Sequence, residues 1–234
     1  MARYIDMKRI LLLICLTAGW LVGMAQDDIT QPEVVLETDS GVVRVKLYNE
    51  TPLHRDNFLK LVKSGFYDGL LFHRVIDDFM IQTGDSVSRN APAGKLLGDG
   101  SYEKYKIPSE ICFPKLFHKR GSLAAAREGD SENPKRESSM CQFYIVWGKR
   151  YSGNMMDDVA ERIARNTGDI ISFPQEVRDA YYKYGGTPHL DNQYTVFGEV
   201  IEGLDVVERI MRSETDKNNR PLKDIHIKHA FVVE

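Results

Sequence analysis

Residues 72–85 of this 234-residue chain read FHRVIDDFMIQTGD, and the rest of the sequence is arranged around them. Apolar residues on either side of the acidic pair at 77–78 predict two short strands joined by a turn. Because neighbouring side chains of a strand point to opposite faces, Met80 and Gln82 share one face, and Arg74 joins them if the strands pair. The stretch therefore predicts a cation, an amide and an apolar floor on one surface. From composition alone, two core strands with a solvated Arg and Gln are the alternative.

The order and length of this stretch resemble, almost residue for residue, the signature of the cyclophilin-type peptidyl-prolyl cis-trans isomerases. Such a match is more specific than a single glycine motif. Residues 141–146, CQFYIV, and 189–200, HLDNQYTVFGEV, also resemble the family. The small residues at 121–127 favour a helix by propensity, but in the family this segment is a strand that receives the substrate peptide. We follow the family, because small side chains leave the main chain open to a peptide.

The resemblance implies a role for each residue of a peptide-binding site. Arg74 is implied to donate a hydrogen bond to the proline nitrogen, and Gln82 to orient the substrate carbonyl. The implied walls of the proline pocket are Phe79, Met80, Tyr144 and Leu190. The peptide on either side of the proline is implied to contact Ala126, Arg127 and Gln142. With His189 and Tyr194 at the pocket edge, these residues form the candidate site.

Four of these residues depart from the family pattern. His189 stands where many eukaryotic members carry a pocket-edge tryptophan, and Tyr194 where they carry a histidine, as in bacterial-type members. Arg127 replaces an asparagine of the peptide groove. Tyr144 replaces a phenylalanine, and its hydroxyl needs a partner or water if it is buried. The first two changes imply weaker cyclosporin binding more than weaker catalysis, whereas Tyr144 bears on turnover and on the preferred residue before proline.

The order of elements along the chain supports the same fold. Alternation over 34–36 and 42–47 predicts an antiparallel hairpin. An N-cap threonine, a first-turn proline and an apolar stripe predict a helix within 51–65. A helix over 204–212 and a strand over 223–233 complete the chain. The expected fold is mainly β, a closed antiparallel eight-stranded cyclophilin-like β-barrel capped by two helices.

Residues 148–187 have no counterpart in the compact family pattern and are expected to form a helical insertion. Apolar spacing over 156–163 predicts one helix, and Ser172 with Gln175 has capping-box spacing for a second. The buried face of the second helix is predicted to hold Val177, Tyr181 and Tyr184. Because implied pocket residues precede and follow the insertion, its helices are predicted to flank the groove.

The N-terminus has the pattern of a secretory signal peptide. A basic pair at 8–9 precedes the apolar run 10–22, and Gly-Met-Ala follows it, so cleavage is expected after Ala25. The run is short for a membrane span, and an uncleaved anchor is the alternative. We expect a signal peptide over 1–25 and one isomerase domain over 26–234, exported to the periplasm or secreted. The mature chain would carry 28 basic and 33 acidic residues, a net charge of −5 that argues against nucleic acid as a partner.

Other residues with reactive side chains indicate no second site. His54 is expected in a polar helix context, the basic run 118–120 is expected to be solvated, and His73 is expected to be structural. The sequence has no Cys-x-x-Cys or His/Cys cluster, so no metal and no cofactor are expected. Cys112 and Cys141 could pair in an oxidising compartment, but sequence does not supply the distance that a disulfide requires.

These observations predict a peptidyl-prolyl cis-trans isomerase that rotates X-Pro bonds in extracytoplasmic folding proteins. Its partners would be proline-containing peptides and unfolded protein clients, and it would act as a monomer without stable membrane insertion after signal cleavage. The alternative is a low-turnover peptide-binding or chaperone module on the same fold, with the insertion docking a partner. The presence of Arg74, Phe79, Met80 and Gln82 together favours the enzyme.

Overall fold

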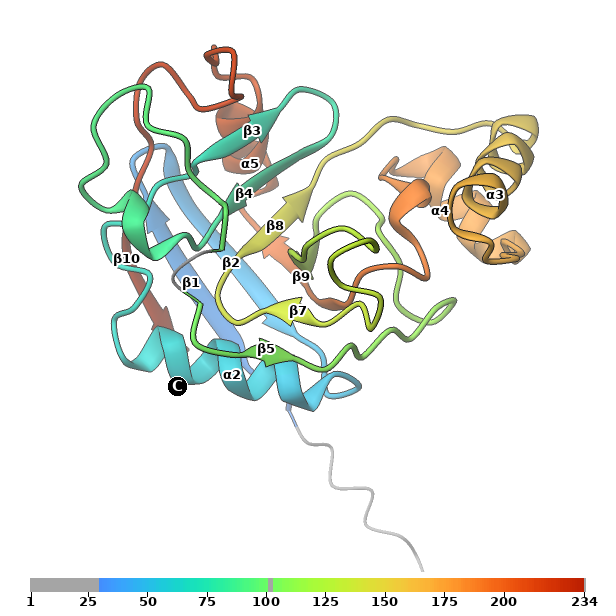
Figure 1. The fold of residues 1–234 in the computed structure, drawn as a ribbon, viewed down its shortest axis with the longest axis horizontal. Helices are drawn as coiled ribbons and strands as arrows, with labels where there is room; N and C mark the ends of the chain where they lie inside the picture. Colours follow the sequence, from blue (N-terminus) through green and yellow to red (C-terminus); the bar gives the residue numbers. More distant parts are fainter. Residues whose placement is uncertain (1–29, 101–102, 234) are drawn as a thin grey trace, which may run out of the picture. The chain divides into compact units, whose positions relative to one another are not determined.

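The computed structural model describes residues 30–100 and 103–233. Eight strands form one antiparallel sheet in the order β10-β1-β2-β9-β6-β8-β4-β3 (Figure 1). These strands are β1 (Glu33–Thr38), β2 (Gly41–Leu47), β3 (Arg74–Ile76), β4 (Met80–Thr83), β6 (Ser122–Ala125), β8 (Phe143–Val146), β9 (Val196–Glu202) and β10 (Ile227–Val232). Two further strands, β5 (Lys106–Ile107) and β7 (Ser138–Ser139), pair with each other. The predicted eight-stranded antiparallel fold is confirmed.

The sheet curls so strongly that the segments preceding its two outer strands meet. The amide of Phe72 donates to the Ile225 carbonyl at 2.9 Å, and the amide of Val75 donates to the Asn219 carbonyl at 2.8 Å. The result is a half-barrel whose inner positions alternate along each strand, as β1 and β2 show in their burial patterns. Four α-helices of the described residues accompany it: α2 (Pro52–Lys63), α3 (Gly153–Thr167), α4 (Gln175–Lys183) and α5 (Leu204–Met211).

The core lies between the sheet and the two helices that cap it, α2 and α5 (Figure 1). Phe58 of α2 packs against the rings of Tyr67, Phe143 and Phe197, with centroids 5.2, 5.2 and 5.5 Å away. Burying each such side chain contributes about 1.5–3 kcal/mol. The strand over 121–127 that the resemblance implied is β6, whose four residues are all buried between β8 and β9. Pairing on both sides therefore outweighs the helical propensity of its alanines.

The first turn of α2 is capped by a side chain from outside the helix. Thr51 holds the N-cap position, but its side chain makes no capping bond. Instead, the Glu110 carboxylate accepts hydrogen bonds from the amides of Leu53 and His54, at 3.0 and 2.9 Å, because an anion is favoured at a helix N-terminus. His54 also contacts Glu110 through Nδ1 at 2.7 Å and is buried, so the polar partner of this helix position is a carboxylate rather than water.

The insertion folds as α3 and α4 around a small core of its own (Figure 1). That core consists of Met156, Val159, Ile163, Ile171, Phe173, Val177 and Tyr181. The predicted capping box of Ser172 with Gln175 is wrong, because Pro174 occupies the N-cap position of α4. Tyr184 is 49% exposed, so the predicted stripe ends one turn early. A 3-10 helix, η2 (Pro188–Leu190), then returns the chain to the sheet and packs against α3.

The predicted signal peptide and its cleavage site lie outside the described residues. In the part of the chain that is described, no helix has the length and apolarity needed to cross a bilayer.

Candidate functional site

The register of three strands brings the predicted polar residues together. In the β3–β4 pair Arg74 lies opposite Gln82, and in the β4–β8 pair Gln82 lies opposite Tyr144. Nη1 of Arg74 donates to Oε1 of Gln82 at 3.1 Å, and Nε2 of Gln82 donates to Oε1 of Gln142 at 3.1 Å. The side chains of Arg74, Gln82 and Gln142 thus form one hydrogen-bonded row. Each member of the row fixes the direction in which its neighbour's free polar atoms point.

A cavity of about 260 Å³ opens beside this row. Nine of the predicted site residues line it: Arg74, Phe79, Met80, Gln82, Ala126, Arg127, Tyr144, Leu190 and Tyr194. One polar corner and an apolar floor are therefore present in a single space. Leu190 belongs to η2, so the segment that follows the insertion forms one wall of the cavity, whereas no residue of 148–187 lines it. That the insertion helices flank the groove stays a prediction.

Arg74 is the half-buried cation of the cavity. Burial lowers the pKa of its guanidinium, and the nearby Tyr194 opposes that shift. A guanidinium stays charged under such conditions. Partial desolvation strengthens any hydrogen bond that it donates to a ligand.

Tyr144 carries the hydroxyl for which the sequence required a partner. That partner is His118, whose Nε2 lies 3.0 Å from the hydroxyl oxygen. His118 is 1% exposed and its Nδ1 lies 2.8 Å from Asp191. The expectation that the basic run 118–120 is solvated was wrong for its first residue, because Asp191, 73 residues further along the chain, supplies a buried carboxylate.

Arg127 does not reach into the cavity as a free cation. Its guanidinium lies over the Tyr194 ring at 4.4 Å and pairs with Asp130 at 2.6 Å. Its Nε donates to the carbonyl of Gln193 at 2.9 Å. With a side chain only 2% exposed, Arg127 braces Tyr194.

His189 and Gln142 lie next to the cavity rather than in its lining. The His189 ring stacks behind Phe79, with centroids 5.5 Å apart and planes tilted by 28°. Burial, with smaller effects of Arg162 and His118, lowers the pKa of His189 to about 4. The ring is therefore neutral near pH 7 and supports Phe79 as an aromatic surface.

Three further residues line the cavity that sequence reasoning did not place there: His73, Leu97 and Gly98. Gly98 has φ 86°, and a Cβ at this position would lie 2.9 Å from Nε2 of His73. The amide of Gly98 donates to Oδ2 of Asp85 at 2.6 Å. The stretch 86–104 is rich in Gly, Pro, Asn and Asp, a composition that predicts a surface loop, but nothing in it indicates that the loop folds back over the site.

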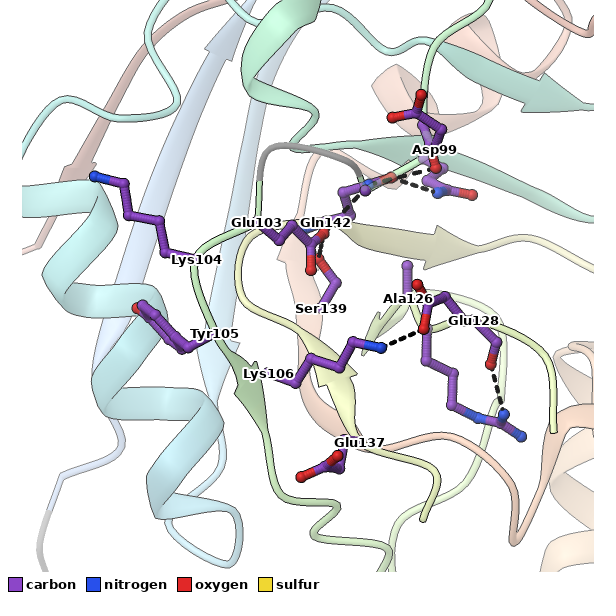
Figure 2. A pocket seen from close by; sticks show the side chains of 14 residues that line it. Asp99, Glu103, Lys104, Tyr105, Lys106, Ala126, Glu128, Glu137, Ser139 and Gln142 are labelled. Carbon is purple, nitrogen blue, oxygen red and sulfur yellow. Dashed lines mark hydrogen bonds and ion pairs between the residues drawn. The ribbon is translucent and has the colours of Figure 1, made fainter. Parts of the chain in front are cut away.

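A second cavity of about 320 Å³ adjoins the first and shares Gln82, Gly98, Ala126 and Arg127 with it. Figure 2 shows its polar lining, with Lys106 reaching toward Glu128, to which it is ion-paired. Oε1 of Glu103 accepts hydrogen bonds from the hydroxyl of Ser139 and, at 3.3 Å, from Nε2 of Gln142. Gln142 therefore stands between the two cavities.

Both cysteines of the described chain are free thiols. Burial raises the pKa of the Cys141 thiol to about 12, which leaves it unreactive at neutral pH. Within residues 30–100 and 103–233, no three His, Cys, Asp or Glu side chains are grouped to hold a metal ion.

Comparison with known proteins gives a consistent match. The model of the family described as cyclophilin type peptidyl-prolyl cis-trans isomerase/CLD matches residues 33–232. A Staphylococcus aureus protein assigned as a peptidyl-prolyl cis-trans isomerase is 33% identical over 203 residues, which cover 86% of this chain and 92% of that protein. A Staphylococcus epidermidis protein with the same assignment is 32% identical over the same length.

Solved structures show the same fold. The crystal structure of a Cryptosporidium parvum cyclophilin type peptidyl-prolyl cis-trans isomerase superposes with a TM-score of 0.60 at 24% identity, covering 87% of this chain and 98% of that one. A second crystal structure of that protein, in the presence of the dipeptide Ala-Pro, gives a TM-score of 0.58.

Proposed function

The chain belongs to the family of cyclophilin-type peptidyl-prolyl cis-trans isomerases, and from this premise we propose that it rotates X-Pro bonds in proteins that fold outside the cytoplasm. The proline is held in the cavity that Arg74, Phe79, Met80, Tyr144 and Leu190 line. The observation that carries this assignment is the Arg74–Gln82 pair facing an apolar cavity.

The reaction needs no covalent step. Rotation about an X-Pro bond breaks amide resonance over a barrier of about 18–20 kcal/mol, so it takes roughly tens to hundreds of seconds unaided. In the twisted transition state the proline nitrogen becomes pyramidal and gains a lone pair. Arg74 donates a hydrogen bond to that lone pair, an interaction that the planar ground state cannot make.

The remaining residues hold the proline and its neighbours. Phe79, Met80 and Leu190 keep water away from the ring, and water favours the planar amide through its hydrogen bonds. Gln82 accepts from Arg74 through Oε1 and so holds the guanidinium in place. Its own position is fixed by Gln142, which also borders the second cavity. A peptide whose proline fills the first cavity can place a neighbouring side chain in the second.

Magnitudes limit what one group can supply. Acceleration from roughly a hundred seconds to milliseconds is about 10⁵-fold, or about 7 kcal/mol. A hydrogen bond from a charged donor contributes about 1.5–3 kcal/mol. Arg74 therefore provides part of the acceleration, and exclusion of water and anchoring of the peptide provide the remainder.

The cis-to-trans rate of a proline tetrapeptide tests the assignment of the site. Arg74→Ala is expected to lower kcat/KM by about 10- to 100-fold, and Arg74→Lys to fall in between, because an ammonium keeps the charge and loses the planar fork. Arg44→Ala is the matched control, since Arg44 lies on β2 and forms ion pairs with Glu33 and Glu202 at the surface. If Arg74→Ala binds an X-Pro peptide and isomerises it as fast as the unchanged chain, the assignment is wrong. If the unchanged chain and Arg74→Ala both bind the peptide and neither isomerises it, the fold serves as a binding module.

The proposed location rests on the N-terminal sequence alone. Basic residues, an apolar run and Gly-Met-Ala at 23–25 have the pattern of a cleavable signal. Intact-mass analysis of the protein recovered from outside the cytoplasm is expected to show a chain that begins at Gln26. A mass that includes residues 1–25 would instead support an uncleaved anchor.

A further inference from the structure

A buried carboxylate lies where the insertion returns to the site. Asp191 follows Leu190, a wall of the proline cavity, and its side chain is fully buried. Oδ1 accepts hydrogen bonds from the amide and from Nδ1 of His118, both at 2.8 Å, and Oδ2 accepts from the hydroxyl of Tyr181 at 2.6 Å. Because a buried charge is tolerated only when its oxygens are satisfied, these bonds fix the positions of His118 and Tyr181 relative to Asp191.

The same histidine extends the network to the cavity wall. In the tautomer whose Nδ1–H donates to Asp191, Nε2 accepts the hydrogen bond that the Tyr144 hydroxyl donates. The two rings are nearly parallel, with centroids 6.0 Å apart. Burial raises the pKa of Tyr144 well above its ordinary value, so its hydroxyl keeps its proton. The hydrogen bonds thus run without a break from Tyr181 in α4 to Tyr144 in the cavity.

A partly exposed set of contacts joins the loop between α3 and α4 to Tyr194, whose ring lies beside that of Tyr144 with centroids 6.1 Å apart. Asp169, just after α3, pairs with Arg136 at 2.6 Å, and Arg136 also reaches Asp130 at 3.4 Å. Asp130 holds Arg127, which lies over the Tyr194 ring. Ion pairs with solvent access are weak, so these contacts are secondary to the buried network.

A purely structural reason for the buried network is weak. If apolar side chains replaced the whole network, with a phenylalanine at position 144, the wall would be complete and no buried polar group would need a partner. Replacing a buried charged network with apolar side chains is often neutral or stabilising. What the network adds is a defined orientation of the Tyr144 ring.

We propose that His118 and Asp191 are positioning residues that set the Tyr144 wall of the proline pocket, and that Tyr181 makes α4 of the insertion part of this device. The inference rests on the proposed place of Tyr144 in that pocket. It gives the insertion a role in the isomerase site that requires no contact between α4 and the substrate.

A double-mutant cycle on the full chain tests the proposal. Tyr144→Phe and Tyr181→Phe each remove one hydroxyl and keep the ring. Each is expected to lower kcat/KM on a proline tetrapeptide by about two- to tenfold. The kcat/KM of the double variant is expected to be no lower than that of the more impaired single variant, because both changes act through one network. Tyr151→Phe is the control, because Tyr151 touches the Tyr181 ring from the same insertion core and lies outside the hydrogen-bonded chain. It is expected to leave kcat and KM unchanged.

A spectroscopic readout separates positioning from a general loss of stability. The Nδ1 proton of His118, bonded to a buried carboxylate, is expected to resonate downfield of the amides and to shift in Tyr144→Phe and in Tyr181→Phe, but not in Tyr151→Phe. Additive losses in the double variant, or a Tyr181→Phe variant with lower stability but unchanged kcat and KM, would overturn the proposal. If Arg74→Ala and Tyr144→Phe both leave isomerisation unchanged, the proposed site itself is wrong. If they reduce it and Tyr181→Phe does not, the proposed function stands and the present proposal is overturned.

Discussion

The imidazole of His73 is buried next to Arg74, and it is one of two histidines of the described residues whose pKa burial lowers to about 4, the other being His189. Burial lowers the pKa of His73 to about 4; Asp85 opposes the shift and Arg74 adds to it. A histidine in an unfolded chain titrates near 6.5, so between about pH 6.5 and pH 4 the unfolded state binds a proton that the folded state does not. Stability is therefore lost as the pH falls through this window.

We expect His73 to account for a decrease of about 3 kcal/mol in the free energy of unfolding between pH 6.5 and pH 4. Urea unfolding at several pH values measures it. His73→Gln should show a shallower pH dependence than the unchanged chain, whereas His229→Gln, which alters an exposed histidine paired with Asp68, should leave the contribution of His73 in place. Equal slopes for His73→Gln and the unchanged chain would contradict the buried neutral state.

The surroundings of a residue could be predicted from the sequence only when its partners lie near it in the chain. Arg74 and Gln82 lie eight residues apart across one turn, so strand alternation alone placed them together. His118 lies beside Lys119 and Arg120, and a local reading of that run predicts solvent. Its partners Tyr144 and Asp191 are 26 and 73 residues away, and no local pattern connects them.

At the scale of elements, two glycines form the root of the insertion. Gly148 has φ 67°, and a Cβ there would lie 1.9 Å from the carbonyl oxygen of Gly186. Gly186 has φ 148°, and its Cβ would lie 2.2 Å from the carbonyl oxygen of His118. The close approach lets the amide of Gly186 donate to the carbonyl of Lys149 at 2.9 Å. The two ends of the insertion can meet only because both residues lack a side chain.

Gly148→Ala is expected to destabilise the protein by about 2 kcal/mol or more, because it combines a strained φ with a backbone clash. The matched control is Gly153→Ala at the start of α3, where a Cβ meets nothing within 4 Å and alanine favours the helix by up to about 1 kcal/mol. Thermal or urea unfolding distinguishes the two. Equal stability of both variants would show that the backbone around Gly148 and Gly186 can shift to accommodate a Cβ, contrary to the predicted clash.

Elements with a strong period were predictable from sequence, and those that depend on pairing were not. The apolar spacing over 156–163 located α3. The start of α4 was misplaced because a serine with capping-box spacing competed with Pro174, whose own φ already suits a helix start. The strand β6 followed from the family resemblance alone, since its alanines favour a helix until β8 and β9 pair with it.

At the scale of the whole molecule, the first and last described strands pair with each other. Val34 lies opposite Val232 and Leu36 opposite Ala230 in the β1–β10 pair. The amide of Ile227 also donates to the Leu70 carbonyl at 2.8 Å, which ties β10 to the segment before β3. The resemblance predicted an eight-stranded fold, but alternation within each strand does not reveal which strands become neighbours. Pairing between strands almost 200 residues apart is set by the global fold.

This pairing predicts that the two ends of the domain differ in their tolerance of truncation. A chain that begins at Gln31 keeps every strand of the described residues and is expected to fold and to isomerise a proline tetrapeptide at the rate of the longer protein. A chain that ends at His226 lacks β10 and uncovers Val34 and Leu36, each fully buried, at a cost of about 1.5–3 kcal/mol per side chain. It also leaves β1 with an unpaired edge that promotes aggregation. Circular dichroism during urea unfolding, with the isomerase assay alongside, compares the two. Cooperative unfolding of the chain that ends at His226 would show that closure by β10 is dispensable.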